Sequence, residues 1–135
     1  MNEVFADTSG IYALLVSNDR WHLQARAILE VLERQQTILI TSSYVLQETV
    51  ALLQARAGIE AVRLFQQAVA PSLEVNWVSE DIYSRAMAAL VSAANRAISL
   101  TDWSSFEIMR ARGIHHAFAF DPHFSQQGFT LIPTP

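Results

Sequence analysis

Short apolar runs that alternate with longer helical stretches constrain the fold of this sequence more than any other feature. The apolar runs predict β-strands at residues 4–7, 38–40, 73–78, 117–120 and 130–132. The stretches between them predict helices at residues 8–15, 22–34, 44–56, 59–70 and 101–112, and another that begins after Ser79. Strands that alternate with helices pair in parallel and carry helices on both faces of the sheet. We therefore predict an α/β fold of three layers, α/β/α, with a central, mostly parallel sheet of about five strands.

The length of the chain, 135 residues, fits one domain that spans residues 1–135. Hydrophobic residues make up 51% of it, which is enough to fill a core without disulfides or a structural metal. No apolar run approaches the roughly 18 residues of a membrane span, and the first residues lack the features of a signal peptide. We expect a soluble, cytoplasmic protein with no membrane partner.

Two residue types that the sequence lacks narrow its chemistry. The chain has no cysteine, which excludes thiol nucleophiles and thiolate zinc sites. All nine basic residues are arginine, which excludes Schiff-base lysines and the lysine of phosphate-binding loops. No Gly-x-Ser-x-Gly motif occurs, so a hydrolase with that nucleophile is not expected. Catalysis is left to carboxylates, histidines and hydroxyl groups.

The net charge of −4 argues mildly against a nucleic-acid partner, because domains that bind nucleic acids are usually basic. The 13 acidic residues include four that are candidates for one site, however, and the other nine balance the nine arginines. The excess negative charge is therefore consistent with a single pocket that a divalent metal ion would neutralise.

Two of these candidate acids follow predicted strands directly. Asp7 is the last residue of the first strand, and Asp121 comes directly after the strand at residues 117–120. In parallel sheets the functional site lies outside the carboxyl ends of the strands. Each acid also follows a wholly apolar run, so a buried element should hold its backbone rigidly, as metal ligands require.

The other two candidate acids are expected on helices. Asp102 falls in the first turn of a helix, where an acid also stabilises the helix dipole without any further role. Glu48 lies on an apolar helix face, where a carboxylate needs a partner to offset its desolvation. That partner could be an arginine or a metal ion. Four acids at one rim would repel by roughly 3 to 4 kcal/mol per close pair, and Mg²⁺ or Mn²⁺ would remove the repulsion.

Four short motifs resemble those of the PIN domain, in particular the VapC-like toxins and their stand-alone relatives. The resemblance covers almost the whole chain in the right order and spacing. The motifs are residues 5–9 (FADTS), residues 47–48 (QE), residues 99–102 (SLTD) with Phe106, and residues 118–124 (FAFDPHF) with Gly128 and Phe129.

The resemblance implies an endoribonuclease that hydrolyses single-stranded RNA with Mg²⁺ or Mn²⁺. It implies a homodimer and, for toxin members, an antitoxin protein as inhibitor. The implied catalytic and metal-binding residues are Asp7, Glu48, Asp102 and Asp121, with Thr8, Ser9 and Thr101 as supporting hydroxyls. The sequence departs from the family at Trp103, where members often have a smaller residue.

The remaining polar and aromatic candidates have simpler interpretations. We expect His22 and the pair His115-His116 to be exposed, Trp77 to lie in the core, and Trp103 to lie near the rim of the site. His123 follows Asp121 closely, but we favour packing or helix capping for it. The arginines that could bind phosphate are Arg20, Arg26, Arg56, Arg63, Arg96, Arg110 and Arg112.

Two competing functions follow from other readings of the same residues. A catalytically silent PIN-like module would bind RNA or a protein, although clustered acids bring little to binding. A magnesium phosphohydrolase of the haloacid dehalogenase type needs Asp-x-Asp and a lysine, and this chain has neither. The apolar helices at residues 44–56 and 59–70 are either a dimer surface or part of the core.

Overall fold

A parallel β-sheet forms the centre of the protein. The structure is a computed structural model that describes residues 2–133. Its strands are β1 (Glu3–Ala6), β2 (Ile38–Ser42), β3 (Leu73–Asn76), β4 (His116–Phe118) and β5 (Thr130–Ile132). They form one five-stranded sheet in the order β3-β2-β1-β4-β5, and every pairing is parallel. The predicted sheet is confirmed, including β5 at an edge.

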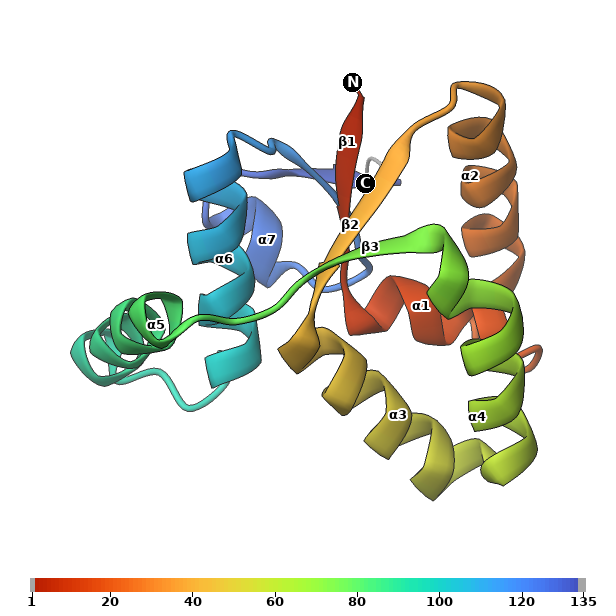
Figure 1. Ribbon diagram of the computed structural model, residues 1–135, viewed down its shortest axis with the longest axis horizontal. Coiled ribbons are helices and arrows are strands. Elements are labelled where there is room, and N and C mark those ends of the chain that lie inside the picture. The colour runs from red at the N-terminus through yellow and green to blue at the C-terminus, as the bar shows by residue number, and fades with distance from the viewer. Residues whose placement is uncertain (1, 134–135) are drawn as a thin grey trace.

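Helices cover the sheet on both sides, which confirms the predicted α/β/α layers (Figure 1). The helices are α1 (Thr8–Leu15), α2 (His22–Arg34), α3 (Ser43–Ala57), α4 (Ile59–Leu64), α5 (Glu80–Ala93), α6 (Leu100–Arg112) and α7 (His123–Gln126). On one side lie α1, α2 and α4, on the other α5 and α6, and α3 continues from the carboxyl end of β2. Of the described helices, none has the length and apolar character needed to cross a membrane.

The central strand β1 shows why the sheet forms here. Val4, Phe5 and Ala6 have no exposed surface, because β2 and β4 flank the strand and helices cover both of its faces. A strand buried on both faces needs a continuous apolar run rather than an alternating one. The chain then turns into α1 at Asp7, whose side chain caps the helix.

Several predicted elements end earlier than the sequence pattern indicates, among them the strand predicted at residues 73–78, which ends at Asn76. The helix predicted at residues 59–70 is α-helical only to Leu64, and continues as a π-helical turn at Phe65–Val69 and a 3₁₀ turn at Ala70–Ser72. The strand predicted at residues 117–120 ends at Phe118. The backbone N–H of Phe120 instead donates to the hydroxyl of Ser9, so Phe120 has left the ladder of the sheet.

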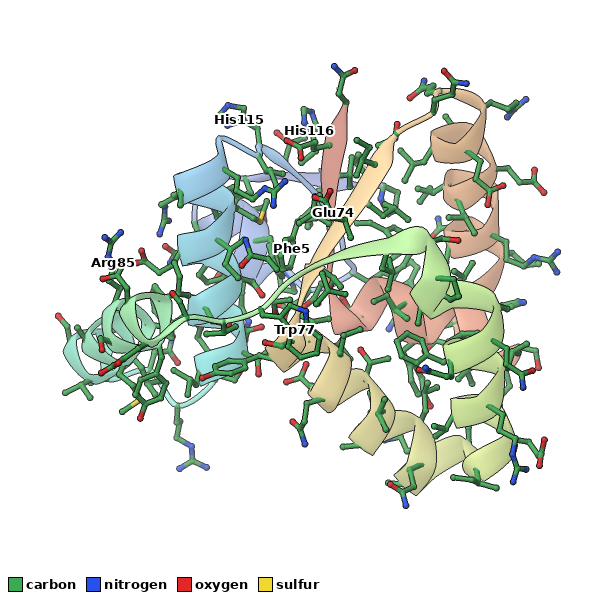
Figure 2. The ribbon with its side chains drawn as sticks, in the orientation of Figure 1. Phe5, Glu74, Trp77, Arg85, His115 and His116 are labelled. Atoms are coloured by element: carbon green, nitrogen blue, oxygen red, sulfur yellow. The ribbon has the colours of Figure 1, made fainter. Side chains whose placement is uncertain are left out.

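The prediction that Trp77 lies in the core is wrong. Strand β3 ends at Asn76, and the side chain of Trp77 is 72% exposed. Because β3 is an edge strand, the chain leaves the sheet here and crosses toward α5, with Trp77 above the start of α3 (Figure 2).

The histidines at the amino end of the sheet lie away from the strand ends that carry the acids. His115 is exposed as expected, whereas His116, which begins β4, is half-buried, and both lie at the opposite end of the sheet from the start of α3 (Figure 2). His22 differs from expectation, since it is half-buried with its Nδ1 2.8 Å from the carbonyl oxygen of Ala13. That contact joins the start of α2 to α1.

Candidate active site

Asp7 lies where β1 turns into α1, and its carboxylate is almost completely buried at 3% exposure. The Oδ2 atom accepts hydrogen bonds from the backbone N–H of Ser9 at 3.2 Å and from the Ser9 hydroxyl at 2.7 Å. The backbone N–H of Asp7 donates to the carbonyl oxygen of Phe118 at 3.1 Å. These contacts fix the carboxylate between β1 and β4, as the position after a buried strand predicts.

Asp102 occupies the first turn of α6 and is buried. Its Oδ2 accepts from the backbone N–H of Ser99 at 3.0 Å, and the Ser99 hydroxyl accepts from the N–H of Asp102 at 3.1 Å. This reciprocal capping box stabilises the start of the helix. The structural role considered for Asp102 is therefore real, but it uses only one of the two carboxylate oxygens.

Asp121 and His123 form the third part of the site. Asp121 lies in the turn beyond β4 rather than at the end of the strand, and its Oδ1 accepts from the backbone N–H of His123 at 2.9 Å. The His123 Nδ1 atom lies 2.9 Å from Oδ1 of Asp121 and 4.0 Å from Oδ2 of Asp102. That buried nitrogen has no partner with hydrogen-bond geometry among the described residues. His123 thus faces the acids, whereas the sequence favoured a packing or capping role for it.

Glu48 approaches the same place from α3, where it is half-buried. Within residues 2–133 no arginine forms an ion pair with Glu48, so the arginine partner that the sequence left open is not found there. The charge of Glu48 instead acts on Asp102 and helps to raise its pKa.

The charges of the four carboxylates act on one another. Burial raises the pKa of Asp7 to about 7, and the charges of Asp102 and Asp121 add to the rise, while the Ser9 hydrogen bonds oppose it. Burial also raises the pKa of Asp102, with further contributions from the charges of Asp121 and Glu48. We call Asp7, Glu48, Asp102 and Asp121 the acid cluster. Such a cluster without a cation costs stability, as the sequence argument anticipated.

The oxygens of the acid cluster suit a divalent cation. In Asp7, Asp102 and Asp121, one oxygen is fixed by a local hydrogen bond, and the other accepts none within residues 2–133. Neither oxygen of Glu48 accepts one within that range. One oxygen each of Asp102 and Asp121 and one nitrogen of His123 lie within 4.8 Å of one another, in a group that does not include Asp7 or Glu48. Oriented carboxylates with free oxygens are the ligands that Mg²⁺ and Mn²⁺ prefer.

Hydroxyl groups hold the elements of the site together. The Ser9 hydroxyl donates to Asp7 and accepts from the backbone N–H of Phe120 at 3.0 Å, so it joins the two segments that carry Asp7 and Asp121. Thr49, beside Glu48, donates to the Thr8 hydroxyl at 3.2 Å. The sequence indicated Thr8 and Ser9 as supporting residues. Thr101 supports the helix through its carbonyl oxygen instead, which accepts from Ser104 and Ser105.

Trp103 does not lie at the rim. It is 8% exposed and packs edge-on against Phe106, with the ring centroids 5.5 Å apart. A base could not stack on it without repacking the core, so the larger side chain at this position does not alter the mouth of the site.

Gly10 is a residue of the site that the sequence analysis missed. A Cβ atom at this position would lie 2.5 Å from the carbonyl oxygen of Phe118 and 2.9 Å from its ring. Only glycine lets α1 approach β4 this closely. The available signal was a glycine inside a helix, which is unfavourable unless packing requires it.

Gly10→Ala is expected to destabilise the protein by about 1 to 3 kcal/mol through this overlap. In an open helix the same change would stabilise by about 1 kcal/mol, so the sign of the effect tests the close approach. Denaturant unfolding of both proteins measures it. A variant as stable as the wild type, or more stable, would contradict the packing of α1 on β4 described above.

Comparisons with known proteins agree with this geometry. The family model described as the PIN domain matches residues 4–129. The 23S rRNA-specific endonuclease VapC20 of Mycobacterium tuberculosis is 35% identical over 130 residues, which cover 96% of this chain and 97% of that protein.

Solved structures show the same likeness in three dimensions. The crystal structure of Mycobacterium tuberculosis VapC20, described as a Sarcin-Ricin loop cleaving toxin, matches with a TM-score of 0.82 at 34% identity over 94% of this chain and 96% of that chain. FitAcB from Neisseria gonorrhoeae matches with a TM-score of 0.67 over 95% of each chain, but at 16% identity it supports the fold alone. By its family match and its extended identity to VapC20, the chain belongs to the PIN-domain family.

Proposed function

We propose that this protein is a metal-dependent endoribonuclease that hydrolyses phosphodiester bonds in RNA and acts as the toxin of a toxin–antitoxin pair. The observation that carries the proposal is the acid cluster, in which three oriented carboxylates each keep one oxygen free. VapC20, which is named an endonuclease, resembles this chain over almost its whole length. A catalytically silent binding module has no use for such a costly group of charges.

Asp7, Glu48, Asp102 and Asp121 would hold Mg²⁺ or Mn²⁺, through the oxygens that local hydrogen bonds leave free. When bound, the metal lowers the pKa of a water molecule and stabilises negative charge on the phosphate. One of Asp102 and Asp121 orients the attacking water for in-line displacement. The expected products carry a 5′-phosphate and a 3′-hydroxyl.

The similarity to VapC20 also supports proposals for the RNA substrate and the protein partners. VapC20 is described as a toxin that cleaves the sarcin–ricin loop of 23S rRNA, and we propose an RNA stem-loop of this kind as the substrate here. An antitoxin protein would inhibit the toxin, and the toxin itself would form a homodimer. Gel filtration of the purified protein tests the homodimer. Co-expression with the product of a neighbouring reading frame tests the antitoxin.

Incubation of the purified protein with an RNA oligonucleotide of the sarcin–ricin loop tests the activity. We expect cleavage in Mg²⁺ or Mn²⁺ and none in excess chelator. A matched control is Asp81→Asn, because Asp81 is an exposed acid of α5 that pairs with Arg85 away from the site. It should cleave within about twofold of the wild type. No cleavage of this or any other RNA at any metal concentration would leave the silent binding module as the better account.

A further inference from the structure

The side chains of Phe120, Trp21 and Arg20 stack on one another, and Phe120 directly precedes Asp121 of the acid cluster. The rings of Trp21 and Phe120 are nearly parallel, at an angle of 8° with their centroids 5.2 Å apart. The guanidinium carbon of Arg20 lies 4.3 Å from the centroid of the Trp21 ring. Phe120 and Trp21 are half-buried and Arg20 is exposed, so the stack ends in a positive charge at the surface.

The inner end of this stack is anchored to the site. Phe120 directly precedes Asp121, and its backbone N–H donates to the Ser9 hydroxyl, which donates in turn to Asp7. Two hydrogen bonds therefore separate the backbone of Phe120 from the carboxylate of Asp7. The outer end is fixed too, because the backbone N–H of Trp21 donates to Asp19 at 2.9 Å.

Arg20 is one of several arginines that form no ion pair within residues 2–133. Arg63, Arg85 and Arg112 form ion pairs with acids, and Arg110 donates to Gln127. Unlike the other arginines without an ion pair, Arg20 lies over Trp21, which in turn stacks on Phe120, the residue before Asp121.

We propose that Arg20, held over the ring of Trp21, binds a backbone phosphate of the RNA strand that enters the acid cluster. This inference rests on the proposed function, since it assigns a substrate-binding residue to the same site. A protein with a net charge of −4 gains no general attraction for RNA. A local cation beside the acids is therefore needed to bring the strand to them.

An arginine stacked on a tryptophan, as Arg20 is on Trp21, is well suited to bind a phosphate. The indole face restricts the guanidinium to one plane and leaves its N–H edges free to form paired hydrogen bonds with phosphate. Restricting the side chain before binding reduces the entropy lost on binding. Trp21 is thus a positioning residue, and Phe120 connects it to the site.

Binding of a fluorescently labelled sarcin–ricin loop RNA tests the proposal, measured in chelator so that the strand stays intact. Arg20→Ala should weaken binding about tenfold. It should also reduce the slope of log K against log salt by about 0.7, the loss of one phosphate contact. Arg34→Ala is the matched control, because Arg34 is also exposed and unpaired within the described residues but lies at the other end of α2. It should leave both quantities unchanged.

Three further variants separate positioning from charge. Arg20→Lys should keep the salt slope but bind more weakly, because a lysine ammonium does not lie flat on an indole. Trp21→Leu should weaken binding about threefold with the slope unchanged, and Trp21→Phe should restore it. Melting temperatures check that each variant is folded, and Arg20, being exposed, can be changed without repacking the core.

An unchanged salt slope in Arg20→Ala would overturn the proposal, as would an equal loss in Arg34→Ala. These results are distinct from a failure of the proposed function. If the wild type cleaves RNA in metal and Arg20→Ala binds normally, only the Arg20 assignment falls. If the wild type cleaves no RNA, the nuclease assignment falls, whatever the binding data show.

Discussion

Asp7→Asn is expected to lower RNA cleavage by at least about a thousandfold. Loss of a metal ligand removes several kcal/mol of stabilisation from the transition state, and about 4 kcal/mol corresponds to three orders of magnitude in rate. The side chains of asparagine and aspartate have nearly the same size and shape. Asparagine caps helices as well as aspartate does, and its amide oxygen can still accept from Ser9, which now donates to Asp7. The loss should therefore reflect charge and not folding.

Single-turnover cleavage of the labelled sarcin–ricin loop RNA measures this effect, with saturating Mg²⁺ or Mn²⁺. The Asp81→Asn control makes the same chemical change at an exposed position of α5. Near-normal cleavage by Asp7→Asn would contradict the assignment of Asp7 as a ligand. Equal losses in the two variants would point to a general effect of charge instead.

Without metal, the protein is expected to lose about 3 kcal/mol of stability as the pH rises from 5 to 8. The folded state holds a proton on Asp7 up to a pKa of about 7, whereas the unfolded chain releases it near the model value of 3.8. Between these values the folded state binds more protons, so stability falls with increasing pH and levels off above about 7. Burial causes most of the shift. The raised pKa of Asp102 acts in the same direction.

Thermal unfolding in chelator at a series of pH values measures this loss, which should appear as a fall of about 10 °C in melting temperature. Asp7→Asn is the control, because asparagine does not titrate. It should resemble the wild type at pH 5 and be more stable at pH 8. Saturating Mg²⁺ should remove most of the fall, since the metal binds the ionised form. A wild-type protein that gains stability from pH 5 to 8 in chelator would show that Asp7 is ionised in the metal-free fold.

The sequence pattern predicted the inner strands of the sheet well because they are short and largely buried. Residues 4–6 and 38–40 are continuous apolar runs, and both form strands where expected. The same rule failed beyond Phe118, where the apolar run continues but the strand stops. A contact across the fold, from Phe120 to Ser9, ends the strand there. Local periodicity carries no information about such a contact.

The acid cluster could be predicted for a similar reason, and its neighbours could not. Asp7 follows a strand and Glu48 is an acid on an apolar helix face, so each has a local signal. Gly10 and His123 depend on what lies opposite them, the carbonyl oxygen of Phe118 and the carboxylates of Asp102 and Asp121. The stack of Arg20 and Trp21 on Phe120 also joins segments that are far apart in the sequence.

A crystal of the protein soaked in Mn²⁺ tests the central claim most directly, because anomalous scattering locates the ion without assumptions about activity. If the acid cluster binds a divalent metal ion, a strong anomalous peak is expected at direct coordination distance from the free carboxylate oxygens of Asp7, Asp102 and Asp121. In crystals of Asp7→Asn the peak should be absent or weak at the same Mn²⁺ concentration. A wild-type crystal with no peak among these carboxylates, or with Mn²⁺ bound only elsewhere, would contradict the assignment of the acid cluster as a metal site.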